Sequence, residues 1–304
     1  MISFIIPAFN SSKTIERAIK SILEQEKTEL DYEIIVVNDG GVDDLDDKME
    51  QYRSHQKIKY FKKENSGVAD TRNVGVEKAS GDYIIFVDSD DYISSSLLKD
   101  IEPYINKNID LIKWNPIFVN EEQEELKRYT PVVFDIVTGE EGFNKLFGKD
   151  NLIDCLWNYA IKKEAVLKFP SGCYHEDFAV MPKIILNSKT FVALENYEYY
   201  YVQSSNSIMR NNDKEKTRKK LQDKLIHFDN LIKETSKMNI SELTKQNVAI
   251  YLTNSMLAVV AELDEQNKEY YVQELKKRKV QQYIKIRNFK QLLKRMVLGI
   301  KFRL

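Results

Sequence analysis

The segment Gly81-Asp82-Tyr83-Ile84-Ile85-Phe86-Val87-Asp88-Ser89-Asp90-Asp91 is the most informative part of this chain. Residues 83–87 are apolar or aromatic and rich in β-branched side chains, which predicts a buried strand. Ligands of open α/β sheets bind just beyond the carboxyl ends of the strands, so Asp88 and Asp90 would be placed to hold a divalent ion that bridges nucleotide phosphates. The alternative is an acidic turn whose Asp and Ser side chains cap a helix that begins at Leu97.

Strand-like and helix-like segments alternate through the first third of the chain. We predict strands at 2–6, 32–37, 58–61 and 83–87, with helices at 15–25 and 68–79 between them. Such alternation predicts an α/β fold, with a mostly parallel sheet that carries helices on both faces. Weaker signals follow: strands at 111–114, 132–137 and 191–194, and helices at 140–147 and 178–186.

The last third is different in character. Glycine and proline are absent from Asp213 until Gly299, and the sequence is charged and helical throughout. We therefore predict two domains, 1–212 and a helical appendage at 213–304. The first domain is divided at residue 110, where the regular alternation ends.

Composition describes a soluble globular protein. Of 304 residues, 42% are hydrophobic and 31% are charged. The two cysteines, Cys155 and Cys173, lack metal-ligand spacing and indicate a reducing compartment. No basic leader begins the sequence, and no apolar run approaches the ~20 residues that span a bilayer, so we expect a cytoplasmic enzyme or binding protein.

The charge is distributed unevenly. Residues 276–304 hold eleven Lys or Arg and no acid, which leaves 35 basic against 47 acidic residues before them, a net charge of −12. Apolar residues from Phe289 to Ile300 recur at helical spacing, so this basic tail is predicted to contact an anionic membrane peripherally. The alternative is a helix packed on the first domain, 1–212, or on a second subunit, which leaves a homo-oligomer open. A nucleic-acid partner is not expected, because the body is acidic.

Three loops at predicted strand ends combine carboxylates with small or polar residues. They are 7–10, 38–41 and 88–91, and on a parallel sheet they converge on one edge. Asp39 can accept a hydrogen bond from a base imide N–H, although Asp39-Gly40 is also typical of an ordinary turn. In 65–75, Arg72 can pair with Asp carboxylates or with phosphate, or form only a surface salt bridge.

Together these motifs resemble family 2 glycosyltransferases of the GT-A fold, the Rossmann-like type that assembles bacterial surface polysaccharides. The resemblance rests on Pro7-Ala8-Phe9-Asn10, Asn38-Asp39-Gly40, the 65–75 block and 81–91, in that order. It continues through Trp157-Asn158, His175-Glu176-Asp177 and 199–208, and covers roughly residues 1–210. The residue after Asn158 is Tyr159, where the family often has Lys.

The resemblance implies a role for each matching residue. Residues 1–110 would bind the nucleotide-sugar, and 111–212 would contain the acceptor site and the base. Asp39 would read the uracil edge of a UDP-sugar, Arg72 would support the nucleotide, and Asp88 and Asp90 would hold Mn²⁺ or Mg²⁺. Asp177 would be the catalytic base, with Ser205, Ser207 and Arg210 closing over the diphosphate. The full set implied for donor and metal binding is Pro7, Ala8, Asn10, Asp39, Asn65, Gly67, Arg72, Asp88, Ser89 and Asp90.

From residue type alone, the preferred interpretation of Asp177 is a carboxylate that caps the helix predicted at 178–186, and its role as base rests on the resemblance. We predict a metal-dependent inverting glycosyltransferase that moves a hexose from a UDP-sugar to a hydroxyl of a cell-surface glycan or lipid-linked saccharide. The competitors are a nucleotidyltransferase, which would want a basic Gly-rich phosphate loop near the N-terminus, and a dinucleotide-binding dehydrogenase, which would want G-x-G-x-x-G. A non-catalytic glycan- or nucleotide-binding scaffold is the third.

Overall fold

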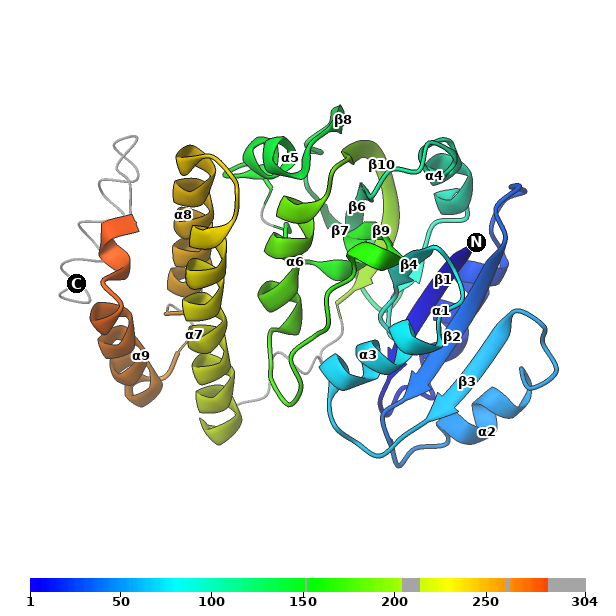
Figure 1. The fold of residues 1–304 in the computed structure, drawn as a ribbon. Coiled ribbons are helices and arrows are strands. Elements are labelled where there is room, and N and C mark those ends of the chain that lie inside the picture. The colour runs from blue at the N-terminus through cyan, green and yellow to red at the C-terminus, as the bar shows by residue number, and fades with distance from the viewer. Residues whose placement is uncertain (151, 204–213, 261–262, 284–304) are drawn as a thin grey trace. The chain divides into compact units, whose positions relative to one another are not determined.

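The structure is a computed structural model that describes residues 1–150, 152–203, 214–260 and 263–283. It divides into two compact units, Met1–Arg210 and Asn211–Leu304, which are described separately. Strands and helices alternate at the start of the first unit (Figure 1): β1 (Ile2–Ala8), α1 (Ile15–Leu23), β2 (Tyr32–Asn38), α2 (Leu45–Glu50), β3 (Ile58–Lys62), α3 (Val68–Lys78) and β4 (Tyr83–Phe86).

The predicted parallel arrangement is present in this part of the sheet. The order is β3-β2-β1-β4, and all three pairings are parallel. Strand β1 continues past its predicted end, through Pro7 to Ala8. Proline is tolerated there because β4 pairs with β1 only as far as Ile5, so no neighbouring strand needs the N–H that Pro7 lacks.

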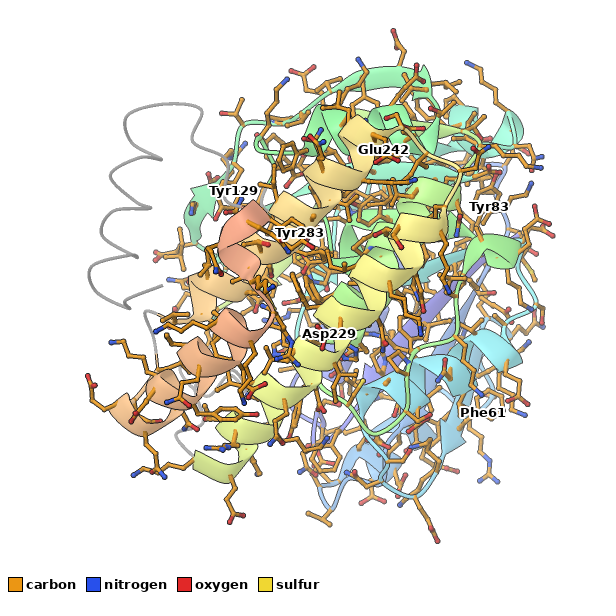
Figure 2. The ribbon with its side chains drawn as sticks, turned by 60° about the vertical axis from the view of Figure 1, so that its left-hand side comes forward. Phe61, Tyr83, Tyr129, Asp229, Glu242 and Tyr283 are labelled. Atoms are coloured by element: carbon orange, nitrogen blue, oxygen red, sulfur yellow. The ribbon has the colours of Figure 1, made fainter. Side chains whose placement is uncertain are left out.

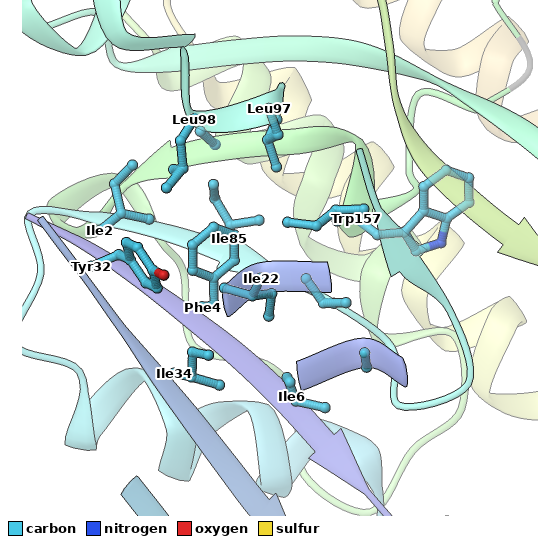
Figure 3. Close-up of a cluster of buried hydrophobic side chains, with 14 of the residues drawn as sticks. Ile2, Phe4, Ile6, Ile22, Tyr32, Ile34, Ile85, Leu97, Leu98 and Trp157 are labelled. Atoms are coloured by element: carbon cyan, nitrogen blue, oxygen red, sulfur yellow. The ribbon is translucent and has the colours of Figure 1, made fainter. Parts of the chain in front are cut away.

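Helices cover both faces of these strands, as predicted. The large core cluster joins Phe4 and Ile34 of the sheet to Ile19 of α1 on one face (Figure 3). Helix α3 packs on the other face, where a Cβ added at Gly75 would lie 2.3 Å from Cγ2 of Ile5. A side chain at this position would therefore force the helix away from the sheet.

The second half of this unit extends the sheet beyond β4 with a mixture of parallel and antiparallel strands. The order continues β4-β9-β6-β10-β5, where β6 and β10 are parallel and β9 is antiparallel to both β4 and β6. Strands β6 and β10 are longer than predicted. Their C-terminal ends pair with each other, and β7 pairs with the end of β6 on its other side. The elements are β5 (Tyr92–Ile93), α4 (Leu97–Asn106), β6 (Leu111–Val119), β7 (Glu125–Arg128), β8 (Phe134–Val137), α5 (Gly139–Leu146), the 3₁₀ turns η1 (Leu156–Asn158) and η2 (Lys163–Ala165), β9 (Tyr159–Lys162), α6 (Glu176–Asn187) and β10 (Phe191–Val202).

The second unit is helical, with α7 (Lys214–Lys237), α8 (Glu242–Val259), α9 (Glu265–Lys277) and η5 (Val280–Tyr283). Side chains cap the N-termini of two of these helices: Ser241 accepts from Thr244 N–H before α8, and Asp264 accepts from Asn267 N–H before α9. Within the described part of the chain, every helix is too short or too polar to traverse a bilayer.

Part of the basic tail belongs to this unit. Arg278 donates to Asp229 of α7 (labelled in Figure 2) at 2.9 Å and to Glu274 at 2.7 Å. This cation is therefore engaged within the helical unit. The apolar stripe from Phe289 to Ile300 lies outside the described residues.

Candidate active site

The loops after β1 and β2 are joined by hydrogen bonds. Asp39 N–H donates to Ala8 O at 2.8 Å, and Val42 N–H donates to Asn10 Oδ1 at 2.9 Å. Asn10 has a φ of 50°, a left-handed conformation that Asn accepts more readily than most residues. The first two predicted loops therefore meet at one edge of the sheet.

Asp39 attaches a third segment to this edge. Its carboxylate is 4% exposed and accepts from Ser66 N–H at 3.0 Å and Gly67 N–H at 2.9 Å, and it pairs with Lys63. Gly40 has a φ of 72° and Gly41 N–H donates to Asn38 Oδ1 at 3.1 Å, so the predicted turn is present; in addition, Asp39 holds the loop that begins α3. That Asp39 accepts a hydrogen bond from the uracil edge of a UDP-sugar stays a prediction. Both carboxylate oxygens already accept hydrogen bonds, so a base would have to share them.

Three apolar side chains that the sequence did not single out stand exposed on these loops. Phe9 is 45% exposed, Val42 94% and Val68 38%. Exposed apolar groups on loops that meet at one edge form a rim suited to a flat ring. Single exposed residues of this kind carry no sequence signal.

The acidic turn after β4 is not a helix cap. Strand β5 separates it from α4, which begins after Ser96. Asp88 is half-buried and Asp90 is exposed. Partial burial and the neighbouring Asp88 charge raise the pKa of Asp90, which is the electrostatic setting that a cation would relieve.

Asp91 has a structural role that the sequence did not distinguish. It is 1% exposed and accepts from Tyr199 Oη at 2.8 Å and from Val202 N–H at 2.7 Å. Tyr199 Oη in turn accepts from Asp88 N–H at 3.1 Å. Burial and the charges of Asp90 and Asp88 raise the pKa of Asp91 well above its usual range. The acidic turn is thus fastened to β10.

Arg72 connects the acidic turn to the start of α6. It is 6% exposed, it donates to Asp88 Oδ1 at 3.0 Å, and it pairs with Glu176 through its other terminal nitrogen. The interpretation as a surface salt bridge is wrong, because the guanidinium and Glu176 are both buried. The pairing with Asp carboxylates that the residue type predicted is present at Asp88.

Asp177 lies next to this pair, in the first turn of α6. The N-cap position is occupied by His175, with a φ of 60°, but the Asp177 carboxylate accepts from Phe178 N–H at 2.7 Å and so satisfies a donor of the first turn, as the capping interpretation predicted. Burial and the charges of Glu176 and Asp154 raise the pKa of Asp177 to about 8, while Arg72 opposes this rise. A carboxyl group with a pKa near neutrality is suited to general base catalysis. Asp154 is a neighbour that the sequence had not indicated.

Aromatic residues from two predicted motifs meet beside the acidic turn. Trp157 stacks on Tyr199, with ring centroids 4.6 Å apart. Burial and the charges of Asp91, Asp88 and Asp90 raise the pKa of Tyr201 to about 12, so this ring also lies near the turn. Tyr159, expected in the acceptor region, is instead fully buried and donates to Ile153 O at 2.9 Å. Ser205, Ser207 and Arg210 lie outside the described residues.

The acidic turn suits a hard divalent cation that is also held by substrate. Mg²⁺ and Mn²⁺ sites of this kind use one or two carboxylates together with phosphate oxygens. Asp88 and Asp90 supply two carboxylates. Among the residues that the structure describes, no group of three or more acidic, His or Cys side chains forms a complete cage. These residues therefore fit an ion completed by a diphosphate.

The sequence profile described as "Glycosyl transferase family 2" matches residues 3–168, just over half of the chain. The chain belongs to this family. It is therefore a glycosyltransferase, and the matched region contains the β1, β2, α3 and acidic-turn residues described above.

Curated relatives of this glycosyltransferase are themselves transferases. The cholesterol galactosyltransferase of Borreliella burgdorferi is 28% identical over 68% of this chain and 61% of its own length. The poly(ribitol-phosphate) beta-N-acetylglucosaminyltransferase TarS of Staphylococcus aureus is 26% identical over 66% of this chain and 35% of its own length. The chain thus spans less than two thirds of these relatives.

Solved structures confirm the fold. The crystal structure of S. aureus TarS 1-349 with UDP-GlcNAc aligns with a TM-score of 0.73 and 22% identity, over 90% of this chain and 79% of that one. The mannosyltransferase PcManGT of Pyrobaculum calidifontis, solved with GDP-Man and Mn²⁺, aligns with a TM-score of 0.56 and 13% identity, over 98% and 86%. The GT-A fold predicted from the sequence is confirmed.

Proposed function

We propose that this glycosyltransferase moves a hexose from a UDP-sugar to a hydroxyl of a cell-surface glycan or lipid-linked saccharide, with inversion at the anomeric carbon. The observation that carries this proposal is the Arg72 bridge. One buried guanidinium contacts both Asp88 of the acidic turn and Glu176, the neighbour of Asp177. The acidic turn, which is suited to holding a cation, and the Glu176-Asp177 segment, which is suited to taking a proton, are therefore linked by one side chain.

The donor end of the site would be formed by the joined loops after β1 and β2. Pro7, Ala8, Asn10, Asn65 and Gly67 would line it, with Asp39 at its base. The exposed Phe9 ring would cover a face of the uracil. The UDP-GlcNAc bound by the TarS structure supports a UDP-sugar as donor.

Asp88 and Asp90 would hold a divalent cation, which supplies charge neutralisation for the departing diphosphate. Arg72 would hold the Asp88 carboxylate in place through its hydrogen bond, and Ser89 lies between the two metal-binding aspartates. The Mn²⁺ in the mannosyltransferase structure supports a metal in this role.

Asp177 would act on the acceptor. In its ionised form it would accept the proton of the acceptor hydroxyl as that oxygen attacks the anomeric carbon, and the sugar–phosphate bond breaks on the opposite face. The electron pair leaves with UDP, so one base is sufficient and no covalent intermediate is needed.

A donor-turnover assay tests this function. We expect UDP release from a UDP-sugar panel with Mn²⁺, its loss in EDTA, and its recovery on adding Mn²⁺. Asp90→Ala should lose metal-dependent donor binding, whereas Asp177→Asn should retain donor binding and lose transfer. Lys99→Ala, on an exposed turn of α4, is the matched control and should behave as wild type. Normal turnover by both site variants would disprove the assignment.

For location, we propose the cytoplasm with peripheral contact between residues 276–304 and an anionic membrane. The excess of eleven cations in this segment supports it. Truncation after residue 275 should reduce cosedimentation with anionic vesicles relative to neutral ones. Equal sedimentation of both proteins would exclude the tail as the contact.

A further inference from the structure

The two aspartates proposed as metal ligands are supported in different ways. The Asp88 carboxylate accepts from Arg72, and the Asp88 N–H donates to Tyr199 Oη. The Asp90 carboxylate is exposed, and no other residue in the described part of the chain donates a hydrogen bond to it. The position of the Asp90 carboxylate is therefore set by the main chain that carries it.

That main chain is held by Arg17 of α1, a residue that the sequence did not single out. The Nη2 group of Arg17 donates to the carbonyl oxygen of Asp90. The next amide along the chain, Asp91 N–H, donates to Asp88 O at 3.1 Å. Both polar groups of the peptide unit between Asp90 and Asp91 are thus engaged, so this unit cannot rotate without losing a hydrogen bond.

The guanidinium of Arg17 is itself held in place. Its Cζ lies 5.5 Å from the centroid of the Tyr92 ring, which is within the range of a cation–π contact. Tyr92 in turn stacks on Tyr200, its partner in the β5–β10 register, with ring centroids 4.5 Å apart. A planar guanidinium that lies over a fixed ring loses little further freedom when it donates to a carbonyl.

Two further residues of α1 hold the segment that follows the acidic turn. Ser21 and Gln25 lie one and two turns further along the same face of the helix. Ser21 Oγ accepts from Ile93 N–H at 3.2 Å. Gln25 donates to Ser94 O at 2.6 Å and accepts from Leu98 N–H at 2.9 Å. Helix α1 therefore cannot shift along this segment without losing several hydrogen bonds.

Arg17 has two effects of opposite sign on a cation at the acidic turn. Its positive charge repels a second cation, so a purely electrostatic role would make cation binding stronger when the charge is removed. Its hydrogen bond fixes the main chain of Asp90, so a positioning role would make cation binding weaker when the side chain is removed. The sign of the change therefore distinguishes the two roles.

We propose that Arg17 is a positioning residue for the divalent cation and acts through the main chain of Asp90. This proposal rests on the proposed function, in which Asp90 is a metal ligand. Residues that orient metal ligands contribute about 10- to 100-fold to metal affinity. Arg17 contacts the main chain and not the carboxylate, so we expect an effect at the lower end of this range, about 10-fold.

Calorimetry of UDP binding measures this effect without turnover. Wild type and Arg17→Met are titrated with UDP, once with Mn²⁺ and once with EDTA. The ratio of the two dissociation constants is the strengthening of UDP binding by the metal. We expect Arg17→Met to reduce this strengthening by about 10-fold and to leave the UDP affinity in EDTA unchanged. Arg17→Lys keeps the charge and a donor, and should recover part of the loss.

Matched variants separate positioning from loss of charge or of stability. Lys20→Met removes a cation of the same helix whose side chain is 60% exposed, and it should behave as wild type. Gln25→Met removes contacts that do not touch Asp90, so it should lower the melting temperature and keep the effect of Mn²⁺. Arg17→Gln carries the same prediction as Arg17→Met and replaces it if the methionine variant does not fold.

Three results would overturn the proposal. An unchanged or larger effect of Mn²⁺ in Arg17→Met would mean that no positioning effect exceeds the repulsion by its charge. An equal loss of UDP affinity in EDTA and in Mn²⁺ would mean that Arg17 contacts the diphosphate or only supports the fold. An equally reduced effect of Mn²⁺ in Gln25→Met would mean that any loosening of this segment has the same result.

Asp90→Ala separates this proposal from the proposed function. Loss of the Mn²⁺ effect in Asp90→Ala, with a normal effect in Arg17→Met, would retain Asp90 as a metal ligand and remove Arg17 as its positioning residue. A normal Mn²⁺ effect in Asp90→Ala would overturn both, because the assignment of the metal ligand would itself be wrong.

Discussion

Replacing Arg72 by Gln should destabilise the first unit and uncouple its two acidic segments. The guanidinium and Glu176 are each 6% exposed. Removing one partner of a buried ion pair leaves the other charge without compensation, which costs about 3 to 5 kcal/mol. The Asp88 side chain is 29% exposed, so water replaces part of its interaction and that pair contributes little. We therefore expect a loss of about 3 kcal/mol, at the lower end of this range.

Fluorescence during urea unfolding measures this loss for the correct unit. Both tryptophans, Trp114 and Trp157, lie in Met1–Arg210. A loss of this size corresponds to a melting temperature lower by roughly 6 to 12 °C for a unit of this length. Arg53→Gln, in an exposed pair with Glu50, is the matched control and should change stability by less than about 0.5 kcal/mol.

A double-mutant cycle decides whether the Glu176 pair is the cause. Glu176→Gln removes the charge that Arg72→Gln leaves uncompensated, so the double variant should regain at least about 1 kcal/mol over the sum of the single losses. Strict additivity, or a loss below about 1 kcal/mol in Arg72→Gln, would refute the idea that the buried Arg72–Glu176 pair stabilises the first unit.

Four further outcomes are expected. Asp177 has a pKa of about 8 and would act as a base in its ionised form, so kcat/KM should rise as the pH increases through about 8. In Arg72→Gln this rise should move to higher pH, because Arg72 lowers the pKa of Asp177. In the folded state the pKa of Asp177 is raised from 3.8 to about 8, so between about pH 4 and 8 the folded state binds a proton that the unfolded state has lost. The free energy of unfolding should therefore fall as the pH rises through that window, and it should fall less in Asp177→Asn; urea unfolding measures this. Gly75→Ala should cost about 1 to 3 kcal/mol in urea unfolding despite its better helix propensity, because the new Cβ would meet Ile5; a gain in stability would mean that α3 can move. Tyr199→Phe should raise the Mn²⁺ concentration needed for half-maximal turnover, since the acidic turn loses contacts at Asp88 N–H and Asp91. It should also lower the free energy of unfolding by about 1 to 3 kcal/mol, because buried partners of the hydroxyl are left unpaired; an unchanged metal requirement would make Tyr199 purely structural.

Local sequence was sufficient to predict the four strands of the β1–β4 half of the fold and its helices α1 and α3, but it missed α2. Strand and helix periods differ, and each segment there carries its own period and its own capping or turn residues. The strands β6 and β10 were predicted too short, because Pro116 and the polar positions of β10 interrupt the local pattern. Proline is tolerated at 116 because β9 pairs with β6 only up to Lys113, which is a property of the neighbouring strand.

The sequence by itself determined the family, the motif order and the residues whose chemistry suits a diphosphate and a proton transfer. Tertiary structure alone decided that Arg72 is buried between Asp88 and Glu176, that Asp91 fastens the turn to Tyr199, and that Trp157 stacks on Tyr199. The physical reason is distance along the chain. Arg72 and Glu176 are 104 positions apart, and no local pattern specifies a contact that only the sheet order brings within a few ångströms.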